Sequence, residues 1–121
     1  MKGKWAKYAL KRYMLLKNWK KHATIIAKAC KETLGEKCLQ VYVVGGAAEN
    51  RLTVLSDIDI VIIVNDDSLK TIDTILAIKR KAREIGLPDE APIDLKILTP
   101  NEFNNLVSKG IYKKTIKIKT Y

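Results

Sequence analysis

The chain has 121 residues, 47% of them apolar, and its 23 Lys and Arg against 13 Asp and Glu give a net charge of +10. This length predicts one compact domain, residues 1–121, with a core of its own. The longest apolar run, Ile58–Val64, is far shorter than the roughly 20 residues of a membrane span, and the first residues lack the apolar stretch of a secretory signal, so we expect a soluble cytoplasmic protein with no membrane association.

Residues 1–34 predict a basic N-terminal helix. The first 31 residues hold ten Lys or Arg and no Asp or Glu, and apolar residues recur at helical spacings over residues 4–34 until Gly35 ends the pattern. A helix of about 45 Å would be unusually long, so we expect a break near Asn18 or an overhang beyond the domain. Its aromatic residues indicate either a core stripe under a solvated lysine face or a surface for nucleic acid or an acidic partner, and no recognisable nucleic-acid module accompanies it.

The two cysteines, Cys30 and Cys38, lack the His or Cys partners of a zinc site. We expect both to be small buried hydrophobic residues, since an intracellular disulfide is typical mainly of hyperthermophiles. A Lys-rich chain with a single Gln fits a thermophilic source, although six Asn weigh against it. The single histidine, His22, is far in sequence from the candidate acids described below and is expected to be structural or on the surface.

The rest of the chain alternates strands and helices. Apolar runs predict strands at 40–44, 58–64 and 92–98. Helices are expected from the cap Ser68 to about residue 85 and from the cap Thr99 through about Ser108, and the tail 111–121 is either a strand or a last helical turn. This order predicts an α/β or α+β domain, with a small mixed sheet flanked by helices.

Three carboxylates stand in or beside apolar strands. Asp57 and Asp59 flank Ile58, and the two-residue period of a strand places both on one face. Asp94 lies within the third strand, so the three acids converge if the strands are neighbours. Because clustered negative charges repel each other, a bound Mg²⁺ or Mn²⁺ is the expected solution, and we take these three residues as candidate metal ligands and catalytic residues.

A glycine pair precedes the acids. Gly45 and Gly46 end the first strand, and glycines in such a turn let a phosphate approach backbone N–H groups. The sequence predicts a tight turn here, after which residues 47–52 could open a short helix. The phosphate cradle and the candidate metal site would then belong to one unit.

Taken together, these features resemble a known signature. Residues 43–60 read Val-Val-Gly-Gly-Ala-Ala-Glu-Asn-Arg-Leu-Thr-Val-Leu-Ser-Asp-Ile-Asp-Ile. This segment resembles the signature of the DNA polymerase beta-like nucleotidyltransferases, in which a strand and Gly-Gly or Gly-Ser precede Asp-hydrophobic-Asp, with a third Asp on a later strand. By its size the chain is similar to the minimal nucleotidyltransferase group of small prokaryotic proteins, which implies a catalytic core at 40–108.

The resemblance implies a role for each matching residue. Gly45 and Gly46 would bind phosphate, with Ser56 as a further triphosphate contact. Asp57 and Asp59 would be ligands shared by two metal ions, while Asp94 would bind the second ion and help activate an acceptor hydroxyl. The implied reaction is attack of that hydroxyl on the α-phosphate of a nucleoside triphosphate, with release of pyrophosphate.

The chain departs from the common pattern at three positions. Many members have Ser where this chain has Gly46, and Arg and Gly where it has Glu49 and Asn50. We expect Arg51 to supply the lost positive charge as a nucleotide-binding residue. The departures leave the three acids intact but put turnover in question.

Two functional hypotheses follow. In the first, the protein is a nucleotidyltransferase that moves AMP from ATP to a hydroxyl on a partner protein; members of the minimal group commonly accompany a HEPN partner, the ribonuclease toxin of a toxin–antitoxin pair, which they inhibit in this way. In the second, it is a non-catalytic antitoxin that occludes its partner with the basic N-terminal helix. Nucleic-acid binding through the basic ends is a third, weaker possibility, and the sequence leaves the oligomeric state open.

Overall fold

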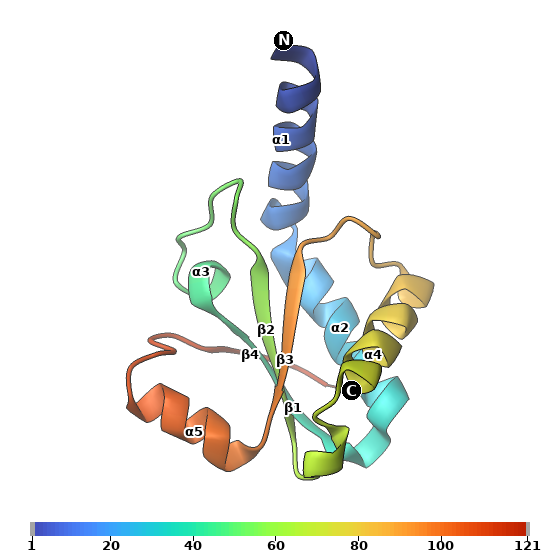
Figure 1. Ribbon diagram of the computed structural model, residues 1–121, viewed down its shortest axis with the longest axis vertical. Coiled ribbons are helices and arrows are strands. Elements are labelled where there is room, and N and C mark those ends of the chain that lie inside the picture. Colours follow the sequence, from blue (N-terminus) through green and yellow to red (C-terminus); the bar gives the residue numbers. More distant parts are fainter. Residues whose placement is uncertain (1, 121) are drawn as a thin grey trace.

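Residues 2–120 are described in the computed structural model (Figure 1). The sheet has the order β3-β2-β1-β4; β1 is antiparallel to β2 and to β4, and β2 is parallel to β3. This mixed sheet flanked by helices confirms the predicted fold class. The elements in chain order are α1 (Lys2–Lys17), α2 (Trp19–Leu34), the 3₁₀ turn η1 (Gly35–Lys37), β1 (Cys38–Val44), α3 (Gly45–Ala48), β2 (Ile58–Val64), η2 (Asp67–Leu69), α4 (Ile72–Ile85), β3 (Ile93–Leu98), α5 (Pro100–Ser108) and β4 (Ile116–Ile118).

The two faces of the sheet are covered by different helices. On β2, Ile60 and Ile62 belong to the main core beneath α2 and α4, whereas Val61 and Ile63 pack with Phe103 of α5 on the other face. This alternation follows from the two-residue period of a strand. Because β2 is buried on both faces, any polar side chain on it has to lie near the end of the strand.

The N-terminal helix breaks where the sequence predicts. Asn18 separates α1 from α2, and its side-chain Nδ2 donates a hydrogen bond to the carbonyl oxygen of Met14 at 3.1 Å. Gly35, with a φ of +59°, ends α2 as expected. Helix α1 also extends beyond the sheet (Figure 1), so the overhang is present as well as the break.

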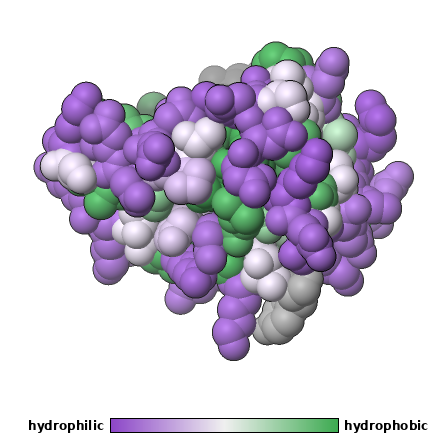
Figure 2. Space-filling model, turned by 90° about the horizontal axis from the view of Figure 1, so that it is seen from below, coloured by the Kyte–Doolittle hydropathy of each residue, from purple (hydrophilic) through white to green (hydrophobic). Residues whose placement is uncertain are grey.

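The aromatic residues of this region divide between two environments. Trp19 packs against the core, but Trp5, Tyr8 and Tyr13 are 61%, 55% and 49% exposed. An aromatic core stripe is therefore wrong for α1, because the helix projects past the sheet that would cover it. By contrast, the end of the molecule opposite α1 is mainly hydrophilic, with a smaller apolar area near its middle (Figure 2).

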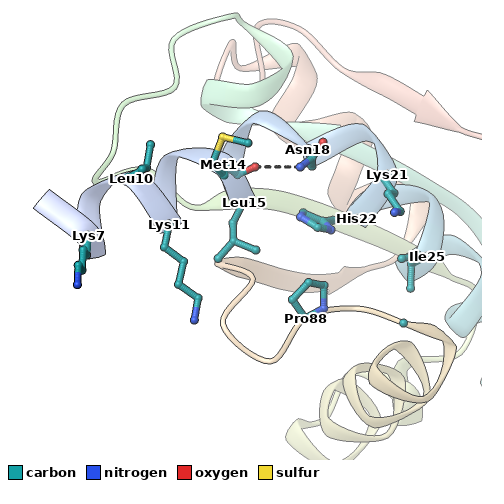
Figure 3. A pocket seen from close by; sticks show the side chains of 11 residues that line it. Lys7, Leu10, Lys11, Met14, Leu15, Asn18, Lys21, His22, Ile25 and Pro88 are labelled. Atoms are coloured by element: carbon teal, nitrogen blue, oxygen red, sulfur yellow. Dashed lines mark hydrogen bonds between the residues drawn. The ribbon is translucent and has the colours of Figure 1, made fainter.

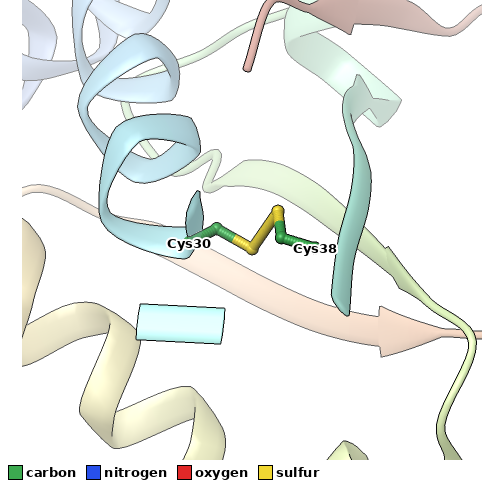
Figure 4. Close-up of a disulfide and its surroundings, with 2 residues drawn as sticks. All are labelled: Cys30 and Cys38. Carbon is green, nitrogen blue, oxygen red and sulfur yellow. A yellow bond between two sulfur atoms is a disulfide. The ribbon is translucent and has the colours of Figure 1, made fainter. Parts of the chain in front are cut away.

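The cysteines are buried as expected, but they are joined. Cys30 near the end of α2 and Cys38 at the start of β1 form a disulfide (Figure 4). The expectation of two independent buried thiols is therefore wrong. The chain reverses direction through η1, which brings the two Cα atoms to 6.1 Å, within the range that a disulfide spans.

Two local predictions need correction, and the structure decides between the two alternatives for the tail. Gly45 and Gly46 are the first residues of α3 instead of a turn before it. Ser68 does not cap α4, because its backbone N–H and hydroxyl both donate to Asp66 and its segment becomes η2; the cap is Thr71, whose hydroxyl accepts from the backbone N–H of Thr74. The tail forms the short edge strand β4, and Tyr121 lies outside the described residues.

Other predicted elements are confirmed. Helix α5 begins with Pro100 after the cap Thr99, which forms a capping box with Glu102, and α4 ends at Gly86. Strand β3 lies within the predicted range 92–98, and its side chains Ile93, Leu95 and Ile97 are buried in alternation. No helix within residues 2–120 is long and apolar enough to cross a membrane.

Candidate functional site

Asp59 and Asp94 face each other on neighbouring strands. They are directly paired in the parallel register of β2 and β3, and both side chains are half-buried. Burial raises the pKa of the Asp59 carboxyl above its ordinary value, and the nearby Asp94 raises it further, while Lys96 acts in the opposite direction. The pair therefore concentrates negative charge that a cation would stabilise.

Asp57 is oriented differently from the other two acids. Strand β2 begins at Ile58, so Asp57 lies in the preceding loop, where its side chain is 57% exposed. Its Oδ1 accepts a hydrogen bond from Nη2 of Arg12 at 3.0 Å. Asp57 is still near enough to raise the pKa of Asp59 slightly. Across residues 2–120, no group of three or more His, Cys, Asp or Glu side chains is arranged as a ready metal site.

Gly45 brings the backbone of α3 against the Asp59 carboxylate. Its φ is +65°, and a Cβ atom built on it would overlap the carboxylate of Asp59. At Gly46 the nearest atom to such a Cβ, in Leu52, would be 3.5 Å away, an ordinary contact. The geometry therefore requires glycine at position 45 but not at position 46. A side chain such as the Ser of many family members would fit at position 46, so no steric reason explains why this chain has Gly46.

The other candidate nucleotide ligands lie on the loop between α3 and β2. The Ser56 hydroxyl accepts a hydrogen bond from the backbone N–H of Thr53 at 2.9 Å, so in this structure it supports the loop. Arg51 pairs with Glu49 at 3.2 Å, so the charge expected to replace a lost arginine is partly neutralised by a neighbouring carboxylate.

A cavity of about 220 Å³ connects most of these groups. Three acids and two cations are the charged groups that line it: Asp59, Asp94 and Glu49, with Arg51 and Lys96, and Gly45 lies beside them. Ser56, Asp57 and Gly46 are not among its lining residues. The structure thus brings together Gly45, Arg51, Asp59 and Asp94, and leaves the other three candidates around the edge.

Two residues of the site were not found from the sequence. Lys96 follows Asp94 on the same face of β3, so the alternation of that strand could have identified it. Arg12 is 45 residues from Asp57, and although it is the one arginine among the ten basic residues of the first 31, nothing near it in the sequence indicates Asp57 as its partner. No local signal predicts the Arg12 contact.

A larger cavity of about 520 Å³ lies between α1, α2 and the loop after α4 (Figure 3). Apolar side chains such as Leu10, Met14 and Ile25 line much of it, with lysines at its rim. His22 also lines it; its side chain is buried, and neither ring nitrogen has a hydrogen-bond partner in the part of the chain that the structure describes. Burial lowers the His22 pKa, which favours the neutral ring. None of the candidate acids reaches this cavity.

The residues of the smaller cavity fit a divalent cation together with a phosphate group. Asp59 and Asp94 present facing carboxylates, the donors that Mg²⁺ and Mn²⁺ prefer, and their mutual repulsion would be relieved by such an ion. Arg51 and Lys96 offer positive charge to phosphate oxygens at the same place. Arg12 engages Oδ1 of Asp57, which leaves Oδ2 of this carboxylate for a role as a third ligand.

Comparisons with known proteins identify the family and the fold. Residues 23–119 match the model of the nucleotidyltransferase domain family. The fold is similar to that of a proposed nucleotidyltransferase from Sulfolobus solfataricus, known from a crystal structure at 1.40 Å resolution; the TM-score is 0.60 with 17% identity, covering 91% of this chain and 85% of that one. No curated protein matches the chain.

Proposed function

Because the chain belongs to the nucleotidyltransferase domain family, we propose that it transfers a nucleoside monophosphate, AMP from ATP, to a hydroxyl group on a partner protein. The observation that carries this proposal is the pairing of Asp59 with Asp94 directly beside Gly45. Two facing carboxylates beside the first residue of α3, where the backbone allows only glycine, offer oxygen ligands to a cation and backbone N–H groups to a phosphate.

The residues of the site have different proposed roles, which follow from their chemistry. Asp59 and Asp94, joined by Asp57, would hold Mg²⁺ or Mn²⁺. When bound, these ions would neutralise charge on the attacking and leaving oxygens of an in-line displacement. Backbone N–H groups at Gly45 and Gly46 would donate to phosphate oxygens, and the side chains of Arg51 and Lys96 would offset the triphosphate charge.

The transfer step balances with groups that this chain supplies. The acceptor oxygen forms a bond to the α-phosphorus, the bond from that phosphorus to the bridging oxygen breaks, and pyrophosphate leaves. The proton of the acceptor hydroxyl passes to a carboxylate oxygen of Asp94, which lies at the rim of the cavity opposite Asp59. Ser56 would help to shape the loop beside the triphosphate.

We propose a specific class of acceptor protein for this reaction. The resemblance to the minimal nucleotidyltransferase group supports a HEPN-type protein as the acceptor, with this chain as the cytoplasmic antitoxin of the pair. The charge distribution agrees with a protein partner, because the projecting helix α1 carries basic and aromatic side chains away from the cavity.

Incubation with ATP labelled at the α-phosphate, Mg²⁺ and the candidate partner tests this function. We expect the label on the partner and an equal amount of pyrophosphate in solution, and neither product with Asp59→Asn/Asp94→Asn. Asp73→Asn is the matched control, because Asp73 is exposed on α4 and lines no part of the cavity. Label transfer that survives loss of both acids would contradict the proposal.

A second candidate function is occlusion of the partner by α1 without any transfer. The exposed apolar side chains of α1 favour it, since Trp5 and Leu10 are 61% and 63% exposed on a helix that projects from the domain. In that case, inhibition of the partner ribonuclease should persist in Asp59→Asn/Asp94→Asn and should be lost in Trp5→Ser/Leu10→Ser. The transfer hypothesis predicts loss of inhibition with the acids.

A further inference from the structure

Arg12 joins the projecting helix to the loop that carries Asp57. Its Nε donates to the carbonyl oxygen of Val54 at 2.6 Å, and its Nη2 donates to the carbonyl oxygen of Ser56 at 2.9 Å and to Oδ1 of Asp57 at 3.0 Å. The Arg12 side chain is 21% exposed, so its bonds to the two carbonyl oxygens are partly shielded from water, whereas Asp57, with 57% of its side chain exposed, remains open to solvent. The planar guanidinium satisfies three acceptors of one loop at once, which an ammonium group does not match.

The rest of α1 has few attachments to the domain. Leu16 is buried at 3% exposure, and Lys11 forms an ion pair with Glu90 in which both side chains are more than half exposed. Such exposed pairs contribute little. Arg12 is therefore the main polar connection between α1 and the candidate site.

Arg12 also accounts for the orientation of Asp57. Asp59 and Asp94 face each other, but the described residues form no three-ligand metal site while Asp57 is directed to α1. The guanidinium engages Oδ1 of Asp57, one of the two oxygens that this carboxylate could offer a cation, and its positive charge lowers the affinity of the three acids for a divalent cation. Both effects act against assembly of the three acids.

We propose that Arg12 is a positioning residue that holds Asp57 apart from Asp59 and Asp94, so that binding of a divalent cation competes with the attachment of α1 to this loop. This inference rests on the proposed function, because it concerns the same three acids. It goes beyond that function by making the position of α1 and the filling of the site mutually exclusive. Anything that moves α1, including a partner bound to its exposed face, would then favour cation binding.

Calorimetric titration with Mn²⁺ and with Mg²⁺ tests the competition in the absence of any reaction. We expect Arg12→Gln to bind the cation roughly tenfold more tightly than the wild type, since the variant frees Asp57 and removes a nearby unit charge. Lys11→Gln is the matched control: it removes one positive charge from the next position of α1, whose partner is Glu90, and should bind as the wild type does. Arg12→Lys keeps the positive charge but lacks the planar guanidinium, so its cation affinity should lie between those of the wild type and Arg12→Gln.

Hydrogen exchange provides an independent readout of the same competition. In the wild type, Mn²⁺ should speed amide exchange in peptides from α1, because the helix loses its main polar connection when Asp57 is released. In Arg12→Gln, these peptides should exchange rapidly with or without Mn²⁺. Circular dichroism establishes whether each variant is folded. If Arg12→Gln does not fold, the same comparison of cation affinity and amide exchange is made with Arg12→Lys.

The outcomes separate failure of this inference from failure of the proposed function. Equal or weaker cation affinity in Arg12→Gln, with binding still lost in Asp59→Asn/Asp94→Asn, would overturn the competition and leave the cation site in place. Weaker binding would mean that Arg12 supports Asp57 as a ligand. Absence of cation binding in the wild type and in every folded Arg12 variant would overturn both.

Discussion

Substitution of Gly45 by alanine tests the close approach of α3 to the candidate acids. The new Cβ atom would meet two independent penalties, a left-handed backbone and an overlap with the Asp59 carboxylate. The chain offers a separate control for each, because Gly35 has a similar φ with open space around it, and Gly46 has ordinary space without a positive φ.

The expected magnitudes follow from these geometries. A left-handed φ costs an L-residue about 1–2 kcal/mol, so Gly35→Ala, at +59° with nothing within 4 Å, should lower the free energy of unfolding by that amount. Gly45→Ala carries the same penalty plus overpacking against Asp59, about 1–3 kcal/mol more, for a total of about 2–5 kcal/mol. Gly46→Ala should be close to neutral or stabilising by up to about 1 kcal/mol, because alanine is the better helix former.

Equilibrium urea unfolding of the three variants measures these differences, and a double-mutant cycle identifies their cause. In the background of Asp59→Ala, the extra cost of Gly45→Ala over Gly35→Ala should disappear, since the carboxylate that the Cβ meets is gone. Equal losses for Gly45→Ala and Gly35→Ala in the wild-type background would refute the close approach, and with it the placement of the glycine turn beside the acids.

Three further predictions concern charge and the disulfide. Because the pKa of Asp59 is raised in the folded state, its ionisation destabilises the fold as pH rises through the raised value. Asp59→Asn should therefore increase the free energy of unfolding at pH 7. Urea unfolding should show that this gain vanishes near pH 3, where the carboxyl group is protonated. Hydrogen bonds from Lys70 and from the backbone of Thr99 lower the pKa of Glu102 to about 2. The stability that Glu102 contributes is therefore complete above its ordinary pKa and is lost as pH falls toward 2. The free energies of unfolding of the wild type and Glu102→Gln should differ at pH 6 and converge near pH 2. Reduction of the disulfide between Cys30 and Cys38, which closes a loop with a sequence separation of 8, should lower the free energy of unfolding by about 2–3 kcal/mol, and unchanged denaturation curves with and without reductant would contradict the bond.

Features set by short stretches of sequence were predictable. The capping box at Thr99 and Glu102 uses residues three apart, and the break at Asn18 follows from the length of one amphipathic pattern. Strand β2 was predictable because its apolar run is long and β-branched. The convergence of Asp59 and Asp94 required one further assumption, that β2 and β3 are neighbours, which the parallel register satisfies.

Features that depend on tertiary structure were not predictable in this way. Arg12 reaches Asp57 only because α1 continues past the end of the sheet, and the cysteine pairing depends on how η1 reverses the chain. Thr71 and not Ser68 caps α4, because the Ser68 hydroxyl donates to Asp66. In each case, the outcome depends on a contact with a group outside the local sequence pattern.

The central claim is that the pair Asp59 and Asp94 holds a metal–nucleotide complex. Calorimetric titration of the protein with ATP, GTP, CTP and UTP, each with and without Mg²⁺, tests it most directly when repeated with Asp59→Asn/Asp94→Asn. We expect Mg²⁺-dependent binding of a nucleoside triphosphate, with ATP bound more tightly than the others, and loss of this binding in the folded double variant. Failure of every nucleotide to bind the folded wild-type protein, or equal binding by the double variant, would contradict it.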